Sequence, residues 1–332
     1  AVGLYASSLG NADLGWEKTA SFNMGVDFNF FDNRISGSVD AYQAKTTDVL
    51  VQRSIPRTTG NSSVWTNIGG IENNGIEVSL VTENIKTRDF NWITAFAFSL
   101  VRNKITKLYD EVTEDLGNSW FIGEPISTIY GYVNDGVWQE EELFNGTIME
   151  GYYPGQFKVR DLSDDGEITA EKDRKILGTT DPNYRISMNN ILTYKNFTFS
   201  LFLNSIRGGN NYYLGGNSGA VVAGGTDSAY RLNRTAIRDY WRPDNAVNDA
   251  PGIYYNPKRN PGVYQSKSFV RLQDVSLGYT FDNSLLSDLK ISTLKVYVSG
   301  KNLYTWTDWS GWDPETGSPM MRSVIGGVNI SF

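Results

Sequence analysis

The segment from Asp161 to Thr169 has the residue types and spacing of a loop that could bind a cation. Oxygen-bearing side chains recur at every second position, and Gly166 supplies the glycine at which such a loop turns. Ca²⁺ takes about 6–8 oxygen ligands from carboxylates, hydroxyls and carbonyls, so the pattern predicts a calcium loop. The candidate metal ligands are Asp161, Ser163, Asp165, Glu167, Thr169 and Asp173.

The end of this loop departs from the calcium pattern. The twelfth position normally carries a bidentate carboxylate, and here that position is Lys172. Asp173, or Glu171 on the other side, would have to take its place. The alternative is an acidic, solvated turn in which the carboxylates accept hydrogen bonds from nearby backbone N–H groups. If Ca²⁺ binds, we expect it to stiffen an external loop and not to take part in catalysis.

The composition restricts the catalytic chemistry that the chain can perform. The 332 residues include Cys 0 and His 0, which removes thiolate nucleophiles, the commonest metal ligand and the commonest general base. Paired carboxylates or a lysine base are still available, but no spacing singles them out. The net charge is -7 with both signs interspersed, which argues against a nucleic-acid-binding surface. We therefore expect neither an enzyme nor a nucleic-acid-binding protein.

The elements that position the loop are strands, and the clearest pattern lies between Asn183 and Asn204. Apolar and polar side chains alternate up to Tyr194, and the alternation resumes at Phe197 after a tight turn. Such alternation gives a strand with one apolar and one polar face. Each arm has about ten residues, and a tilted strand needs roughly 9–11 residues to cross a bilayer. The phase is broken at Asn190, Ile191 and Phe202.

The same pattern recurs along the chain, with short turns and long loops in alternation. Bacterial outer-membrane barrels show this asymmetry, with short periplasmic turns and long extracellular loops. The fold prediction is therefore all-β: part of a transmembrane antiparallel β-barrel, with about nine strands and long extracellular loops. The predicted strands cover residues 22–30, 35–42, 75–83, 90–101, 183–193, 197–205, 269–281, 293–304 and 323–332.

A membrane position fixes the direction in which each strand residue must point. The aromatic share of 13% suits barrel girdles, and the absence of an apolar run of roughly 20 residues does not exclude strands that cross a membrane. The residues predicted to face lipid are Phe22, Phe28, Phe96, Phe98, Ile186, Met188, Phe199, Leu201, Val275, Leu277, Val328 and Ile330. Those predicted to face the lumen are Asp27, Asn189, Ser200 and Ser299.

Several short stretches, each weak alone, form a specific combination that covers most of the chain. They are Leu9–Glu17, Ile35–Asp40, Thr46–Leu50, Ser268–Leu272, Val275–Thr280, Tyr297–Trp306 and Gly311–Glu315. Together these stretches resemble the SusC/RagA family of TonB-dependent outer-membrane transporters. Phe332 is similar to the terminal aromatic residue that barrel assembly uses in such proteins.

The resemblance implies a function in the bacterial cell outer membrane. Family members import nutrients that are too large for porins, typically glycans or peptides. They work with a SusD-like surface lipoprotein, lie in outer-membrane lipid, and draw energy from TonB through a plug domain. No residue can be assigned to the substrate from the sequence. Loop aromatics that could stack on sugars, or that simply pack, are Tyr212, Tyr213, Tyr254, Tyr255 and Trp309.

Residues 1–332 are expected to form the C-terminal part of one such barrel domain, without its plug domain and N-terminal strands. An odd number of strands leaves edges near Phe22 and Val328, and unpaired backbone groups cannot face lipid. We therefore expect an open, curved wall and not a sealed barrel. Two other interpretations stay open: an outer-membrane barrel with an adhesin or structural role, and a soluble carbohydrate-binding β protein.

Overall fold

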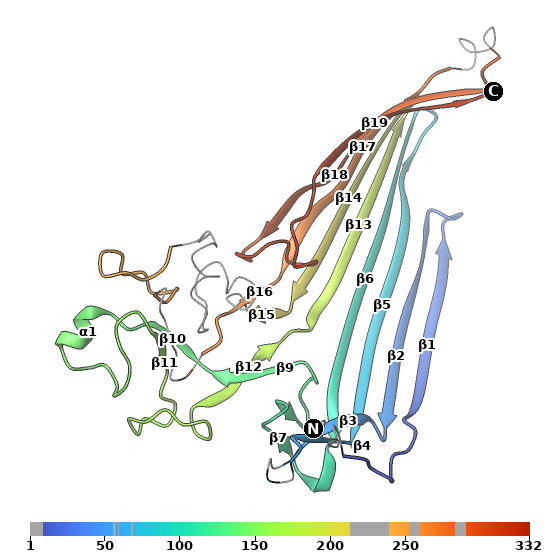
Figure 1. Ribbon diagram of the computed structural model, residues 1–332. Helices are drawn as coiled ribbons and strands as arrows, with labels where there is room; N and C mark the ends of the chain where they lie inside the picture. The colour runs from blue at the N-terminus through green and yellow to red at the C-terminus, as the bar shows by residue number, and fades with distance from the viewer. Residues whose placement is uncertain are drawn as a thin grey trace, which may run out of the picture.

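The computed structural model describes residues 9–332 except 56–57, 59, 68, 213–238, 253–258, 260 and 283–289. A single antiparallel sheet of nine long strands dominates it (Figure 1). These strands are β1 (Lys18–Phe30), β2 (Ile35–Thr47), β5 (Gly70–Lys86), β6 (Phe90–Lys107), β13 (Pro182–Tyr194), β14 (Phe197–Gly208), β17 (Phe269–Thr280), β18 (Thr293–Thr307) and β19 (Ser323–Ser331). All nine predicted spans are confirmed to within one residue of these strands or inside them.

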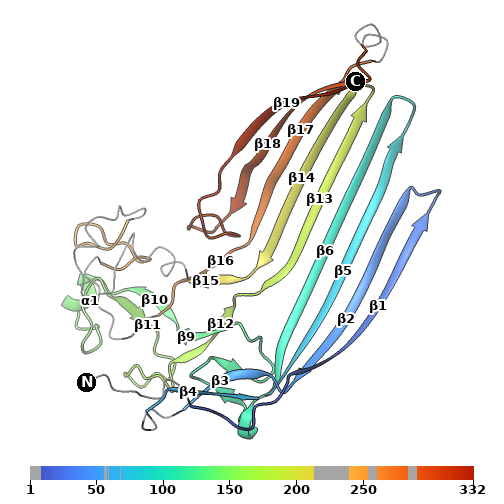
Figure 2. The same cartoon turned by 45° about the vertical axis from the view of Figure 1, so that its right-hand side comes forward.

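The connections at one end of the sheet are short, and those at the other end carry the remaining elements (Figure 2). Among the described residues the long connections contain only short elements, and no helix there is long and apolar enough to cross a membrane. The short elements are β3 (Leu50–Ser54), β4 (Ser63–Asn67), η2 (Tyr109–Glu111), β7 (Glu114–Asp115), β8 (Trp120–Phe121), β9 (Thr128–Tyr132), β10 (Asn134–Val137), α1 (Glu140–Phe144), β11 (Phe157–Val159), β12 (Arg174–Thr179), β15 (Asn210–Tyr212) and β16 (Tyr264–Ser266).

The register places every residue predicted to face lipid on one face of the sheet. Residues that are directly paired across an antiparallel ladder point to the same side. Phe98 pairs with Ile186 and Phe96 with Met188, and the same phase continues to Val328 at the far edge. We call this the outer face. The residues predicted to face the lumen all lie on the opposite, inner face. There Asp27 pairs with Ser38 and Ser38 with Ser79, and Ser200 pairs with Ser276 on strands further along the sheet.

The phase breaks seen in the sequence have two different physical causes. Phe202 is an apolar residue on the inner face, where it pairs with Asn189 and Asp274. The β-bulge beside it lies in β17, and it brings Leu272 onto the outer face opposite Leu203. Asn190, in contrast, stays in phase on the outer face. Its side-chain oxygen accepts hydrogen bonds from Trp92 Nε1 at 3.0 Å and Thr94 Oγ1 at 2.8 Å, so this buried amide has partners on β6.

Aromatic side chains mark the short-turn end of the outer face. Phe90, Tyr194, Phe197 and Tyr279 lie in one transverse row, paired in register across β6, β13, β14 and β17. The Phe197 and Tyr279 rings are 4.8 Å apart. A row of this kind is typical of an aromatic girdle of an outer-membrane barrel. We call it the lower girdle, although the short-turn end is drawn at the top of Figures 1 and 2.

The two outermost strands of the sheet, β1 and β19, lie at opposite edges. Each is paired on one side only, with β2 and β18 respectively, and the described residues contain no ladder between them. The sheet is thus an open, curved wall, as expected, and not a sealed nine-stranded barrel (Figures 1 and 2).

Candidate functional site

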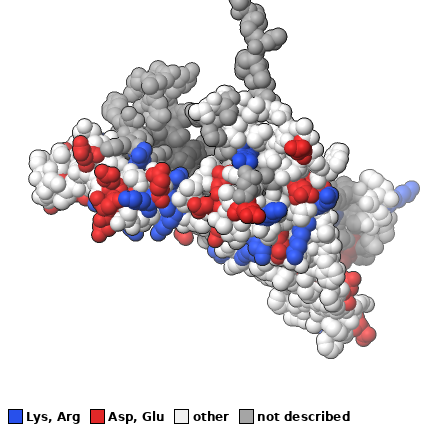
Figure 3. Space-filling model, turned by 90° about the horizontal axis from the view of Figure 1, so that it is seen from below, with Lys and Arg blue, Asp and Glu red and all other residues white. Residues whose placement is uncertain are grey.

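Three long loops from the same end of the sheet pack together on one small core. The buried centre is formed by Val137, Phe157 and Ala250, which are at most 1% exposed. Partly buried side chains from the other loop segments pack against it: Tyr240, Trp241, Val247, Val263 and Trp309. Figure 3 views the molecule from this end, where basic and acidic side chains are interspersed. The three loops therefore pack together into one folded cap at this end of the sheet.

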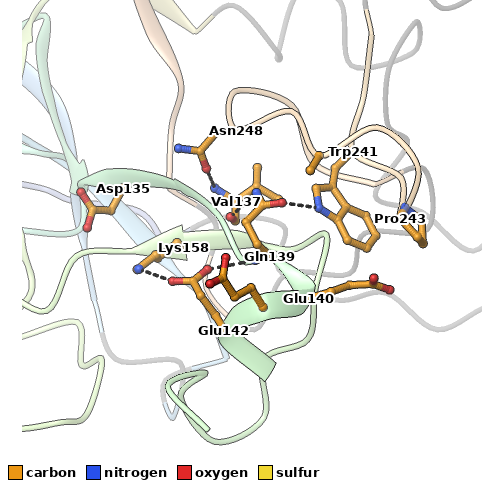
Figure 4. A pocket seen from close by; sticks show the side chains of 11 residues that line it. Asp135, Val137, Gln139, Glu140, Glu142, Lys158, Trp241, Pro243 and Asn248 are labelled. Carbon is orange, nitrogen blue, oxygen red and sulfur yellow. Dashed lines mark hydrogen bonds and ion pairs between the residues drawn. The ribbon is translucent and has the colours of Figure 1, made fainter. Parts of the chain in front are cut away.

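A cleft of about 590 Å³ opens beside this core (Figure 4). Its aromatic wall is Trp241, whose indole N–H donates to the Gln139 side-chain oxygen at 2.8 Å. Asn248 accepts a hydrogen bond from the backbone N–H of Val137 at 2.7 Å, which joins the two loops on the other side. An aromatic face beside several polar groups is the usual lining of a site for a small ligand or for part of a larger one.

The cleft is acidic. Glu142 pairs with Lys158 at 2.7 Å, and Asp135 pairs with Arg160 at 2.6 Å. Burial acts to raise the pKa of Glu142, but hydrogen bonds from Lys158 and from the Gln139 backbone outweigh it and leave that pKa below its ordinary value. Glu140 and Glu141 also line the cleft, and no ion pair to either is formed within the described residues. The cleft thus offers free carboxylates beside an indole face.

The glycine beneath Trp241 should be required for this cap. Gly155 has φ +84°, and a Cβ added there would lie 2.5 Å from Trp241 Cε3. Gly155→Ala should therefore lower the stability of the cap by the cost of a left-handed alanine, about 1–2 kcal/mol. It should also displace the indole ring of Trp241. Gly146→Ala is the matched control, because Gly146 has φ +67° with open space around it. Limited proteolysis of the loops should accelerate clearly more in Gly155→Ala; equal rates would contradict the prediction.

The inner face of the wall has a second hollow, of about 420 Å³. Its lining crosses β2, β5, β6, β13 and β14 and is mostly hydroxyl and charged side chains. Ser38 and Ser79 are hydrogen-bonded at 2.9 Å. Asp40 and Glu77 are directly opposed in register, and Arg185 lies two strands away. This polar, concave surface is suited to a water-filled passage.

The predicted calcium loop is closed by its own backbone. Asp161 accepts hydrogen bonds from the N–H groups of Ser163, Asp164 and Gly166 at 2.7–3.1 Å. Asp173 is fully buried, and its carboxylate accepts N–H groups of Leu162, Ser163 and Thr169 at 2.7–3.2 Å. These contacts correspond to the acidic-turn alternative, with Asp173 as a cap and not as an outward ligand.

The cation that faces Asp165 in this loop is Lys172, at the position where a calcium ligand was expected. Its ammonium lies 2.6 Å from Asp165 Oδ2. The hydrogen bond from Lys172 lowers the pKa of Asp165, and Asp165 in turn raises the pKa of Lys172. Glu167 contributes its backbone N–H to Asp165 at 3.0 Å. The part of the chain that the structure describes has no cluster of three or more acidic side chains placed to hold a metal ion, so calcium binding stays a prediction.

The Asp173 cap makes the loop acid-sensitive. Burial acts to raise the pKa of Asp173, but the backbone N–H groups of Thr169, Leu162 and Ser163 outweigh it, and the pKa falls below its ordinary 3.8. A lowered folded-state pKa contributes stability above the ordinary pKa, which is lost as the pH falls through the lowered value. A protease should cleave the native loop quickly only in strong acid, where Asp173 is protonated. It should cleave the loop of Asp173→Ala quickly already at neutral pH, because the cap is missing. Glu171→Ala, on an exposed neighbour, should leave cleavage unchanged.

The aromatic residues proposed to meet substrate are mostly not placed. Tyr213, Tyr254 and Tyr255 lie outside the described residues, and the backbone of Tyr212 pairs with that of Tyr264. Trp309 packs against the loop core. The cleft residues Gln139 and Asn248 gave no sequence signal, because their role depends on contacts between loops that are far apart in the chain.

The arrangement so far is a curved wall with one apolar face, one polar face and a folded loop cap. A family model described as "TonB dependent receptor-like, beta-barrel" matches residues 1–303. The chain belongs to this family. Its members are receptors and transporters of the outer membrane and not enzymes, which confirms the expectation drawn from the missing histidine and cysteine.

Relatives of this TonB-dependent receptor barrel include SusC/RagA proteins. TonB-dependent receptor P3 of Formosa agariphila is 37% identical over 94% of the chain and 32% of its own length. TonB-dependent receptor SusC of Bacteroides thetaiotaomicron is 28% identical over 97% of the chain and 32% of its own length. The solved structure of the RagAB peptide transporter matches all of the chain with a TM-score of 0.76 and 26% identity. The chain spans 32% to 36% of the length of the curated relatives it matches.

Proposed function

We propose that the protein containing this chain imports large nutrients across the outer membrane by a TonB-dependent mechanism. The observation that carries the proposal is the wall itself: one face is apolar at every predicted lipid position, and the other carries the hydroxyl and charged rows of the hollow. A sheet that is polar on one side only suits a lipid-bounded passage. Strands outside this chain would pair with β1 and β19, and a plug domain outside it would couple to TonB.

The loop cap and cleft are the proposed external entry. A SusD-like lipoprotein would close over this end, and the substrate would be an oligosaccharide or a peptide. The Trp241 face suits sugar rings, and free carboxylates such as Glu140 suit sugar hydroxyls or the amino groups of a peptide. The relative solved as the RagAB complex is named a peptide transporter, which supports a peptide substrate. The SusC relative supports the family.

The test is growth and uptake in the native bacterium. Deletion of the full gene should abolish growth on one oligosaccharide or peptide mixture while small sugars and amino acids still support growth. The full-length gene should restore it, and a version without the residues that contact TonB should not. Co-purification should yield a lipoprotein in stoichiometric amount. Normal uptake of every large nutrient by the deletion strain would contradict the proposal and favour an adhesin or structural role.

Calcium binding is proposed for the 161–173 loop as a separate structural function. The ion would have to displace Lys172 from Asp165. Lys172→Gln removes this competing cation, so the variant is expected to bind calcium more tightly than the native protein in isothermal titration. No heat in either protein would show that the loop is held by its own hydrogen bonds alone. Equal binding in both would show that Lys172 does not compete with the ion.

A further inference from the structure

The outer face changes its chemistry at one level of the wall. On β6 the outward side chains from Phe90 to Leu100 are apolar except Thr94, and the next two are Arg102 and Lys104. In the register, Arg102 is level with Asn74, and Asn74 with Gln43, so polar residues stand in one row across three strands. On the same three strands the row beneath it consists of Leu100, Ile76 and Ala41 and is apolar. The change is therefore a horizontal border on β2, β5 and β6.

This border lies where the hydrocarbon of a bilayer should end. About ten residue steps separate the lower girdle at Phe90 from Leu100, and at roughly 3.3 Å per residue and a strand tilt of about 40° they rise about 25 Å. That height is the usual thickness of the apolar band on an outer-membrane barrel. The residues just above Leu100 therefore lie in the headgroup layer. They are at the long-loop end, which faces the outside, so the layer is that of the outer leaflet.

Two lysines lie beside a single carboxylate just above this level, and Arg102 lies one row below them. We call Lys45, Glu72, Arg102 and Lys104 the border patch. The Glu72 carboxylate lies 3.5 Å from the Lys104 ammonium and 4.0 Å from that of Lys45. Arg102 makes no ion pair within the described residues and donates to the backbone carbonyl of Asn183 at 2.6 Å. The patch thus carries an excess of positive charge on a surface that otherwise contacts lipid.

The Glu72 carboxylate cannot accept hydrogen bonds from all the ammonium N–H groups of Lys45 and Lys104. Its Oε1 already accepts hydrogen bonds from the amides of Gln43 at 2.9 Å and Asn74 at 3.0 Å. The Glu72 side chain is only 12% exposed, whereas those of Lys45 and Lys104 are 62% and 47% exposed. The carboxylate is thus recessed and shared, and each ammonium has donors that point outward. Lysine at such a position acts as a point charge for phosphate oxygens.

We propose that the border patch binds the phosphate groups of lipid headgroups in the outer leaflet. The occupant is a lipid and not a soluble anion, because the patch is continuous with the apolar band below it: the acyl chains would lie on Leu100 and Ile76 while the phosphate meets Lys45 and Lys104. This contact would fix the height of the wall in the membrane. It does not depend on which nutrient the protein imports.

The test compares charge-matched variants of the full-length protein in phosphatidylcholine nanodiscs doped with phosphatidic acid. Native mass spectrometry measures the phosphatidic acid retained on the protein. The double variant Lys45→Gln/Lys104→Gln should retain about 30-fold less, as expected for the loss of two lysines at an anionic lipid surface. The control Lys86→Gln/Lys195→Gln removes two lysines at the short-turn end and should retain the native amount.

A variant with the opposite expected effect separates lipid binding from misfolding. Glu72→Gln removes the competing carboxylate and should increase phosphatidic acid retention. Retention that is unchanged in both border variants, or lost equally in the short-turn control, would overturn the proposal. Complete displacement of the lipid by inorganic phosphate would assign the patch to free phosphate and would overturn it as well.

Discussion

Arg271→Met is expected to lower the free energy of unfolding by about 3–5 kcal/mol, because it leaves a buried carboxylate without its partner. Arg271 is 1% exposed, and its guanidinium is paired with Asp313, which is 4% exposed, and with Glu315 at 2.5 Å. It also donates to Thr305 Oγ1 at 3.2 Å and lies over the Phe269 ring. Methionine keeps much of the volume and removes every one of these polar contacts. Urea titration of the full-length protein in detergent, followed by tryptophan fluorescence, measures the loss.

Two further variants show whether burial is the cause. Arg242→Gln removes an exposed ion pair with Asp244, so the free energy of unfolding should change by less than about 1 kcal/mol. Replacing Asp313 and Glu315 with leucine in the Arg271→Met background should recover part of the loss, since a buried ion pair can often be exchanged for apolar side chains. An Arg271→Met variant as stable as the Arg242→Gln variant would contradict the prediction.

The same ion pairs give a physical reason for two of the sequence stretches on which the family resemblance rests. Ser268–Leu272 contains Arg271, and Gly311–Glu315 contains both of its acidic partners. In the sequence these two stretches are separate motifs, and nothing indicates that their side chains are in contact. The fold joins them, because β17 and β18 are paired and the loop after β18 turns back over Arg271. A resemblance can thus point to a contact before its chemistry is known.

The strands could be predicted because their signal is local. Alternation with a period of two over about ten residues fixes both the strand and its faces, and antiparallel neighbours then bring the apolar faces together. The loop cap could not be predicted in this way. Trp241 and Gln139 are hydrogen-bonded across 102 positions of the chain, and no local pattern encodes such a contact. The acidic loop could be predicted in part. Lys172 departs from the calcium-loop pattern in the sequence, but its ion pair with Asp165 depends on the folded backbone.

The second large effect concerns the middle of the lipid face. Met188 points outward beside Phe96, six positions from Tyr194 in the lower girdle and six from Pro182, where β13 begins at the other end. An arginine at the bilayer midplane costs about 2–4 kcal/mol, because no water solvates it there. Met188→Arg is therefore expected to lower the stability of the folded barrel by that amount. Semi-native gel electrophoresis of the full-length protein should show a correspondingly lower temperature of unfolding.

The adjacent residue supplies the control that distinguishes a lipid face from any other exposed face. Ser187 pairs with Ala97 on the inner face and lines the polar hollow. Ser187→Arg introduces the same side chain at the same height, but into the polar passage, so stability should change by less than about 0.5 kcal/mol. A sheet with water on both faces would tolerate either arginine equally well. Equal unfolding temperatures for Met188→Arg and Ser187→Arg would therefore refute the membrane wall, because the two variants differ only in the face that receives the charge.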